Sequence, residues 1–257
     1  MPTKKSLGQH WLTDRSILAA IAEEAAIAPD DTVLEIGPGL GTLTSELLRR
    51  AARVVAVEFD ADLARKLPGQ FPGKNLEVVH ADILDFDLSS LPSNYKVVAN
   101  VPYYITSKIV QKVSEASNPP QTVVVLVQRE VAERIAARPG AMSMLSVSAQ
   151  VFFEAKTGIE VPREYFTPPP EVDSQTVLLR RRQSPLVAEP DRKAFFRVVR
   201  AGFSERRKKL RSCLAGGLHL AKPDVDELLQ RAHIDPEARA QELSIEQWKI
   251  LADEFKS

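Results

Sequence analysis

The chain has 257 residues, of which 44% are hydrophobic, and its formal net charge is zero. Its one cysteine, Cys213, excludes an intramolecular disulfide and a zinc site with several cysteine ligands, and the four histidines lack metal-ligand spacing. No apolar run approaches the roughly 20 residues of a membrane helix, and Met1–Gln9 has no apolar stretch of a secretory signal. We therefore expect a cytoplasmic protein without a metal or a membrane partner.

Valine-rich apolar runs alternate with helix-like segments over the first two-thirds of the chain. Because the runs are nearly continuous rather than alternating in polarity, they are typical of parallel strands buried on both faces. The order of strands and helices predicts a doubly wound α/β sheet with right-handed crossovers. The predicted strands are Thr32–Ile36, Arg53–Glu58, Leu76–His80, Lys96–Asn100 and Thr122–Gln128. The predicted helices are Asp14–Ala26, Leu40–Arg50, Asp60–Leu67, Ser107–Glu115 and Arg129–Ala137.

The pattern changes in the last third of the chain. Val147–Phe153 and Gln175–Arg180 are candidate further strands, and the proline-rich stretch Val161–Pro170 between them predicts a stiff extended loop. After Arg182 only helices are predicted. They are Asp191–Phe203, Arg206–Leu214, Asp224–Ala232 and Ser244–Phe255. We expect an α/β domain over 1–182 and a small all-helical domain over 183–257.

A glycine loop follows the first strand of the sheet. Gly37, Gly39 and Gly41 come directly after Glu35-Ile36, and glycine allows a tight turn with close approach to a ligand. A dinucleotide fingerprint would need a glycine at position 42, which is Thr42. The spacing instead resembles motif I of the class I methyltransferases, which bind S-adenosylmethionine on a Rossmann-like sheet. By itself such a loop is equally compatible with a plain turn.

Two acids stand at the ends of the next two strands. Glu58 closes the second strand, where a carboxylate can accept hydrogen bonds from both ribose hydroxyls of a nucleoside. Asp82 follows the third strand, at a position suited to an adenine amino group. Either acid alone has a simpler interpretation as a loop carboxylate or helix cap. Their occurrence at successive strand ends favours a cofactor site.

The fourth strand ends in the segment Asn100–Tyr104. The exocyclic amine of adenine is a poor nucleophile, so its methylation needs hydrogen-bond acceptors that orient its lone pair. The Asn100 side chain and the main-chain carbonyl of Val101 or Pro102 are candidates, Pro102 stiffens the loop, and Tyr103 can stack on an extruded base. The alternative interpretation is an ordinary turn, because asparagine and proline are common in turns.

The neutral net charge hides a basic segment. Arg192–Arg211 contains nine Lys or Arg and one acid, Glu205. One interpretation is a solvated helix face; the one that we favour is an RNA-contacting surface, because Arg206, Arg207, Lys208 and Lys209, with Arg211, have few acids nearby in sequence.

The chain resembles the ribosomal RNA adenine dimethyltransferase family along almost its whole length. This family comprises bacterial enzymes that dimethylate two adjacent adenosines near the 3′ end of small-subunit RNA, their eukaryotic nucleolar counterparts, and the erythromycin-resistance methyltransferases. The matching segments are Lys5–Leu12, Glu35–Gly41, Ala56–Glu58, Asn100–Tyr104, Val127–Ile135, Pro139–Gly140, Leu145–Val147, Val161–Pro162, Phe166–Ser174 and Phe203–Arg211. Trp11 departs from the usual Phe, and Arg129 from a frequent Lys.

The resemblance implies roles that the residues alone do not. It implies that His10 and Leu12 contact the cofactor and that Gly37, Glu58, Asp82 and Asn100 complete its site. It also implies that Phe166 faces the target base, although by sequence alone Phe166 is almost as well explained as a hydrophobic anchor. Transfer of two methyl groups to each adenine is implied by the resemblance only.

Three functions are compatible with these observations. The favoured one is dimethylation of adenosines in the small-subunit RNA of an immature ribosomal subunit, by a monomeric enzyme. The second is methylation of large-subunit RNA of the erythromycin-resistance type; Phe166–Ser174 and Phe203–Arg211 look more like the small-subunit branch. The third is a ribosome-assembly factor that binds RNA without catalysis. The intact Gly37, Glu58, Asp82 and Asn100–Tyr103 argue against it.

Overall fold

The computed structural model describes residues 10–256. By its internal contacts the chain forms two compact units, one of residues up to 133 together with 154–181, and one of residues 134–153 together with the segment from 182 onward. The proposed functional division into 1–182 and 183–257 remains a prediction.

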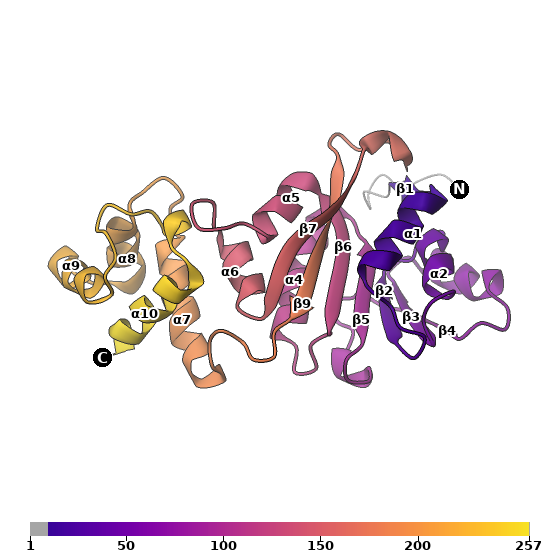
Figure 1. Cartoon of the computed structure of the whole chain (residues 1–257), viewed down its shortest axis with the longest axis horizontal. Coiled ribbons are helices and arrows are strands. Elements are labelled where there is room, and N and C mark those ends of the chain that lie inside the picture. Colours follow the sequence, from indigo (N-terminus) through magenta and orange to yellow (C-terminus); the bar gives the residue numbers. More distant parts are fainter. Residues whose placement is uncertain (1–9, 257) are drawn as a thin grey trace. The chain divides into compact units, whose positions relative to one another are not determined.

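The first unit is built on a seven-stranded sheet with the order β4-β3-β2-β5-β6-β9-β7 (Figure 1). Strands β2 to β6 are mutually parallel, and β9 runs antiparallel to β6. The five predicted parallel strands are confirmed with their bounds: β2 (Thr32–Ile36), β3 (Arg53–Glu58), β4 (Leu76–His80), β5 (Lys96–Asn100) and β6 (Thr122–Gln128). The edge pair is β9 (Ser174–Arg181) and β7 (Phe153–Val161).

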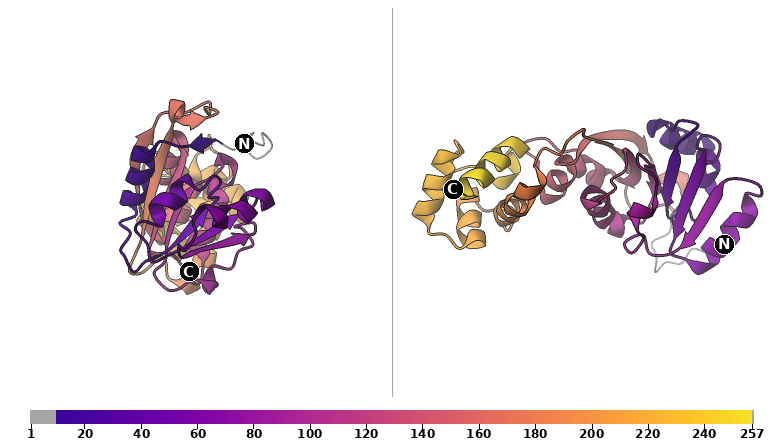
Figure 2. Two further views of the ribbon diagram at one scale, coloured as in Figure 1. Left: turned by 90° about the vertical axis from the view of Figure 1, so that its right-hand side faces the viewer. Right: turned by 90° about the horizontal axis from the view of Figure 1, so that it is seen from below.

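Helices lie on both sides of this sheet, as expected for a doubly wound fold. Helix α1 lies on one side and α4 on the other (Figures 1 and 2). The α-helices of this part are α1 (Arg15–Glu24), α2 (Thr42–Leu47), α3 (Ala61–Lys66), α4 (Thr106–Glu115) and α5 (Arg129–Ile135), and the short 3-10 turns are η2 (Leu67–Gln70), η3 (Leu88–Ser90), η4 (Tyr103–Ile105) and η5 (Arg163–Tyr165). Helix α2 starts later than predicted because Gly41 before it has a left-handed backbone.

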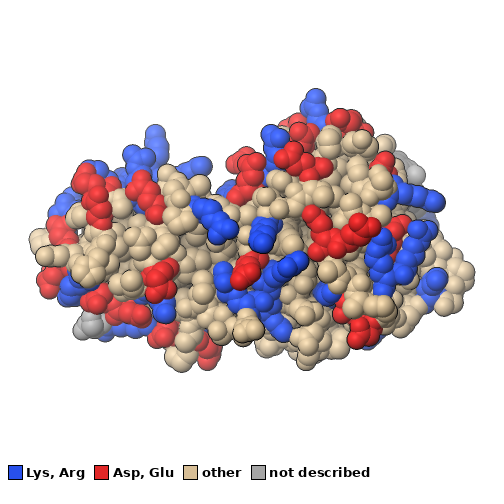
Figure 3. Space-filling model, in the orientation of Figure 1, with Lys and Arg blue, Asp and Glu red and all other residues tan. Residues whose placement is uncertain are grey.

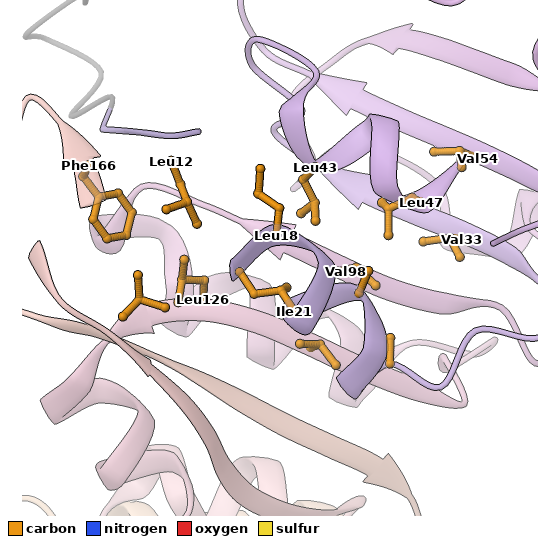
Figure 4. Packing of buried hydrophobic residues seen from close by; sticks show 14 residues of the cluster. Leu12, Leu18, Ile21, Val33, Leu43, Leu47, Val54, Val98, Leu126 and Phe166 are labelled. Atoms are coloured by element: carbon orange, nitrogen blue, oxygen red, sulfur yellow. The ribbon is translucent and has the colours of Figure 1, made fainter. Parts of the chain in front are cut away.

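One hydrophobic cluster joins α1 to the sheet. Leu18 and Ile21 of α1 pack on Val98 and Leu126 of the strands (Figure 4). A second, two-stranded sheet covers the same cluster: β1 (Trp11–Leu12) pairs antiparallel with β8 (Phe166–Thr167). The burial of Leu12 and Phe166 in this cluster fixes the N-terminal segment and the proline-rich segment on the first unit.

The predicted strand Val147–Phe153 is wrong. Residues Met144–Gln150 form helix α6, and β7 begins only at Phe153. Ser143 begins the helix with a capping box, in which its Oγ accepts from the Ser146 N–H at 3.2 Å while the Ser146 Oγ accepts from the Ser143 N–H at 2.6 Å. This cap outweighs the strand preference of Val147. The other candidate, Gln175–Arg180, is confirmed within β9.

The second unit is helical. It contains α6, α7 (Glu189–Gly202), α8 (Leu210–Leu218), α9 (Lys222–Arg231), η6 (Ala240–Glu242) and α10 (Ile245–Lys256). Trp248 is fully buried at its centre, and its ring centroid lies 5.4 Å from that of Phe203. The Gln241 carbonyl accepts hydrogen bonds from the N–H groups of Gly140 and Met142, which ties the 134–153 segment to the C-terminal helices.

Candidate active site

The site lies at one edge of the large sheet. Because β2, β3, β4 and β5 are parallel, their carboxyl ends and the loops that follow them meet there. Two cavities of about 720 and 850 Å³, both open to solvent, occupy this edge. They share Gly37, Glu58, Val101 and Pro102, so they form one continuous groove.

The groove collects the residues predicted for cofactor and catalysis. The first cavity is lined by His10, Leu12, Gly37, Gly39, Glu58, Asn100, Pro102 and Phe166, among others. The second is lined by Asp82 together with Gly37, Glu58 and Pro102. Tyr103 belongs to the turn η4, and its side chain lies outside the described part of the structure. Residues from six separate parts of the sequence thus converge on one groove.

The glycine loop turns because all three of its glycines have positive φ. The values are 66° at Gly37, 56° at Gly39 and 78° at Gly41. At Gly39 a side chain is also excluded by space, since a Cβ there would lie 2.4 Å from Cζ3 of Trp11. At Gly37 a Cβ would meet nothing within 4 Å, and this residue lines both cavities. The loop therefore presents bare backbone to the groove.

Glu58 is buried and held by the backbone. Its Oε2 accepts from the N–H of Gly39 at 3.0 Å, and its Oε1 accepts from the N–H of Asp60 at 2.8 Å. Burial raises the pKa of Glu58, and these two hydrogen bonds oppose that shift. Each oxygen keeps a second lone pair, so the carboxylate is fixed in place and still able to accept hydrogen bonds from a ligand.

Glu35 is a site residue to which the sequence analysis gave no role. Its side chain is 1% exposed, lines the first cavity, and has no hydrogen bond at either oxygen to any described residue. Burial raises the pKa of Glu35 to about 8; nearby Thr44 opposes this shift and the charge of Glu58 adds to it. The Thr44 hydroxyl is likewise buried without a hydrogen-bond partner. A buried carboxyl group whose oxygens make no well-formed hydrogen bond is uncommon in proteins.

Asn100 ends β5 at the wall of the first cavity. Its side-chain amide has no hydrogen bond to another described residue, and it is partly exposed there. The Pro102 carbonyl, by contrast, accepts from the Ile105 N–H at 3.2 Å and so closes the η4 turn. Of the predicted acceptors for an amine, the Asn100 side chain is therefore unengaged, whereas the Pro102 carbonyl already accepts a backbone hydrogen bond.

Residues 10–12 form one wall of the first cavity. The Leu12 carbonyl accepts from the Thr42 hydroxyl at 3.0 Å, and Nδ1 of His10 lies 2.7 Å from the Pro168 carbonyl. Phe166, 2% exposed, packs beside Leu12 in the hydrophobic cluster (Figure 4). Phe166 also lines the cavity. Its position therefore fits an anchor that also presents part of its ring to the groove.

Asp82 lies at the far end of the groove. Its Oδ1 accepts from the Leu84 N–H at 2.9 Å, as in the helix-cap interpretation of the sequence. Its Oδ2 has no hydrogen bond to another described residue, and Asp82 lines the second cavity together with Phe59, Ile83, Tyr104 and Lys108. The turn fixes the carboxylate while leaving an acceptor for a ligand.

The basic segment differs from its prediction. Helix α8 begins at Leu210, not at Arg206, so Arg206–Lys209 form an exposed turn between α7 and α8. These four adjacent cations have no apolar side chain to bury, whereas Leu210 is fully buried. The face in Figure 3 carries basic and acidic side chains intermixed, in keeping with the neutral net charge.

Three of the five predicted RNA-binding side chains have ion-pair partners. Lys208 contacts Glu205 at 2.8 Å, Lys209 contacts Glu237, and Arg211 contacts Asp226. Two of these acids lie far along the chain, where a count of neighbouring acids could not find them. Arg206 and Arg207 are exposed and have no ion pair with a described residue.

Further site residues escaped the sequence analysis. Phe59, Ile83, Tyr104 and Lys108 line the second cavity. Phe59 directly follows Glu58, and Ile83 directly follows Asp82, so adjacency to a predicted site acid was the available signal. Among residues 10–256 no three His, Cys, Asp or Glu side chains are grouped as metal ligands. No helix in the described part is both long and apolar enough to cross a bilayer.

Known proteins resemble the chain over nearly its full length. The family model for ribosomal RNA adenine dimethylase matches residues 2–257. Ribosomal RNA small subunit methyltransferase A of Dehalococcoides mccartyi (strain CBDB1) is 42% identical, with 99% of this chain and 89% of the relative covered. The protein of that name from Bacillus licheniformis is 40% identical, with 98% and 91% covered.

Solved structures agree with this similarity. A dimethyladenosine transferase from Plasmodium falciparum has a TM-score of 0.82 at 27% identity, covering 96% of this chain and 98% of that one. The 23S rRNA methyltransferase ErmE has a TM-score of 0.77 at 33% identity, covering 96% and 100%. The sheet order and helical layers confirm the predicted Rossmann-like methyltransferase fold with a helical C-terminal part. With a family model that spans residues 2–257, the chain belongs to the ribosomal RNA adenine dimethylase family.

Proposed function

We propose that the protein transfers methyl groups from S-adenosylmethionine to the N6 amines of two adjacent adenosines near the 3′ end of small-subunit ribosomal RNA. The observation that carries the proposal is the unengaged amide of Asn100 in the same groove as the glycine loop and Glu58. The relatives at 40–42% identity are named for the small subunit, which favours this substrate over large-subunit RNA. A role in small-subunit biogenesis, acting on an immature subunit in the cytoplasm, is part of the proposal.

The groove fits the proposed cofactor by its chemistry. S-adenosylmethionine carries a nucleoside, an ammonium and a sulfonium. Glu58 is fixed with acceptors for ribose hydroxyls, and Asp82 has an oxygen for an adenine amine in the second cavity. The first cavity contains two buried carboxyl groups, Glu35 and Glu58, and no Lys or Arg among its lining residues. We assign the adenosine to the second cavity and the cationic end to the first, beside His10, Leu12, Gly37 and Gly39.

When bound, S-adenosylmethionine supplies an electrophilic methyl group. The residues of the chain prepare the amine that accepts it. The Asn100 oxygen accepts one N–H of the adenine amine, which turns the nitrogen lone pair out of conjugation with the ring. Pro102 restricts the loop, and the η4 turn closed by the Pro102 carbonyl fixes the backbone that carries Tyr103. We assign Tyr103 and Phe166 to contact the target base. Because transfer needs alignment more than proton transfer, no His or Cys nucleophile is required.

The helical unit is the proposed RNA-binding part. Arg206 and Arg207 are free to contact phosphates, and the ion-paired Lys208, Lys209 and Arg211 lie next to them in sequence. Exposed ion pairs contribute only about 0–1 kcal/mol, so these cations can exchange an acidic partner for a phosphate. We propose a catalytic domain over 1–182, an RNA-binding domain over 183–257, and action as a monomer.

The test is methyl transfer from labelled S-adenosylmethionine to unmethylated small ribosomal subunits, with large subunits in parallel, followed by nucleoside analysis. We expect dimethyladenosine in small subunits alone. Label in large subunits alone would overturn the substrate in favour of the erythromycin-resistance type. Cofactor binding without label in either subunit would overturn catalysis in favour of an RNA-binding assembly factor.

A further inference from the structure

Two exposed aromatic side chains stand at the rim of the second cavity. Phe59 is 61% exposed and Tyr104 is 70% exposed, the highest values among the large exposed hydrophobic side chains of the described residues. They follow β3 and β5, which flank β2 in the sheet, so they stand on opposite sides of the groove. Large aromatic surfaces that are left exposed beside a cavity indicate a binding surface.

Tyr104 is held where it is by the turn that carries it. The Ile105 N–H donates to the Pro102 carbonyl at 3.2 Å, and Thr106, which starts α4, is buried. The ring is therefore exposed on a fixed backbone, only four residues after Asn100. Tyr104 lines the second cavity and the proposed catalytic amide of Asn100 lines the first, at the two ends of the same short segment.

The floor and the rim of the groove near Tyr104 differ in charge. The floor of the second cavity carries the acids Glu58 and Asp82, whereas Lys108 at its lining is exposed and has no ion pair with a described residue. Acidic side chains repel a phosphate, so an uncharged nucleoside fits the floor and a phosphate fits the rim. An aromatic ring and an unpaired cation at one cavity are the usual elements of a single-stranded nucleic-acid contact.

We propose that Tyr104 and Lys108 form an outer ledge that holds the RNA nucleotide next to the target adenosine. The neighbouring base stacks on the Tyr104 ring, and its phosphate contacts the Lys108 ammonium. This inference rests on the proposed function, because the target adenosine is taken to lie at Asn100. The ledge would bind the second of the two adjacent adenosines while the first is in the groove.

The test compares Tyr104→Ala, Tyr104→Trp and Lys108→Ala with the wild-type enzyme on unmethylated small subunits. Stacking on one aromatic side chain contributes about 5- to 150-fold to binding. We expect Tyr104→Ala to raise the half-saturating concentration of subunits in that range and Tyr104→Trp to restore it. Lys108→Ala should raise it less and lower its sensitivity to salt. Tyr165→Ala, at another exposed tyrosine of the same unit, is the matched control and should have no effect.

Calorimetric titration with S-adenosylmethionine alone separates the ledge from a cover over the cofactor. We expect the Kd of Tyr104→Ala for the cofactor to stay within about twofold of wild type. A cofactor Kd weakened as much as the RNA interaction would overturn the ledge, since the ring would then cover the cofactor. An unchanged half-saturating concentration for Tyr104→Ala would overturn it as well. Both outcomes are read against an active wild type, whereas an inactive wild type would count against the proposed function itself.

Discussion

The six-membered ring of Trp11 lies directly against Gly39. A Cβ on Gly39 would stand 2.4 Å from Cζ3 of Trp11, and the backbone of Gly39 has a φ of 56°. We therefore expect Gly39→Ala to displace Trp11 from the cavity wall and to weaken S-adenosylmethionine binding at least about tenfold, because left-handed strain and steric overlap add. Calorimetric titration measures the effect.

The control for this substitution is Gly69→Ala, where a Cβ meets nothing within 4 Å. It should leave cofactor binding unchanged. Combining Gly39→Ala with Trp11→Leu should recover part of the loss, because the smaller side chain relieves the overlap. If the double variant binds no better than Gly39→Ala, contact with Trp11 is not the cause.

Removal of the Asn100 amide should slow methyl transfer without weakening cofactor binding to the same extent. For Asn100→Ala we expect turnover to fall by about 100-fold or more, the usual loss when one preorganised hydrogen-bonding group is removed from an active site. The Kd for S-adenosylmethionine should stay within a few-fold, because Glu58, Asp82 and the glycine loop remain. Single-turnover transfer to small subunits, with calorimetry in parallel, measures both. Wild-type turnover in the variant would refute the role of Asn100 as amine acceptor.

The buried Glu35 should make the unliganded protein less stable as the pH rises. The pKa of Glu35 is about 8 in the folded chain against 4.5 for an ordinary glutamate. Between these values the folded state keeps a proton that the unfolded state has released, so the free energy of unfolding falls with increasing pH and levels off above about 8.

Glu35→Gln removes this dependence because an amide cannot ionise. Relative to wild type, the variant should gain stability by a few kcal/mol on going from pH 5 to pH 8, an order of magnitude set by 1.36 kcal/mol per pKa unit. Urea unfolding of both proteins at both pH values measures the difference and cancels groups that are common to them. A difference that is the same at pH 5 and pH 8 would contradict the raised pKa.

Arg206 and Arg207, the two cations of the turn before α8 without an ion pair to a described residue, should contribute more to the salt dependence of RNA binding than their ion-paired neighbours. Each phosphate contact contributes about 0.7–0.9 to the slope of log K against log salt. Arg206→Ala combined with Arg207→Ala should therefore lower the slope by roughly 1.5, whereas Lys208→Ala combined with Lys209→Ala should lower it less, because these side chains must first leave Glu205 and Glu237. Filter binding to small subunits over a salt series measures both. Equal losses would show that the ion pairs do not matter.

Two substitutions distinguish the anchoring and base-contacting roles of Phe166. Phe166→Ala should cost about 3–5 kcal/mol of stability through the cavity left in the cluster around Leu12. Phe166→Leu keeps most of the apolar volume and should fold nearly normally. If Phe166→Leu also keeps full transfer activity, the ring has only an anchoring role; a loss of activity at normal stability supports contact with the base.

The strands of the sheet could be predicted from the sequence more accurately than the helices and turns around them. Buried parallel strands such as Arg53–Glu58 have a continuous apolar pattern, so their bounds could be predicted residue by residue, and the strand ends placed Glu58, Asp82 and Asn100 at one edge. Val147–Phe153 failed because a local serine cap overrode the strand preference of its valine. The start of α8 was predicted at Arg206, four residues too early. The charged residues before Leu210 have no apolar pattern from which the beginning of the helix could be located.

The remaining misses depended on contacts between distant segments. Pairing of Lys209 with Glu237 and of Arg211 with Asp226 joins residues whose proximity only the fold determines. The orphaned state of Glu35 is of the same kind. Its acidic side chain is visible in the sequence, but the absence of a well-formed hydrogen bond to a described residue at its oxygens becomes apparent only when the packing is known.

The pairing of β1 with β8 has a consequence for synthesis of the chain. His10 and Pro168, whose side chain and carbonyl meet beside this pairing, are 158 positions apart. The wall formed by His10, Leu12 and Phe166 therefore cannot close on a nascent chain until the proline-rich segment has left the ribosome and folded. A shorter nascent chain has the glycine loop and its strands but lacks this wall. We therefore expect the protein to retain its proposed cofactor only after most of the chain has been made, and ligand-induced stabilisation to report on completion of the whole first unit.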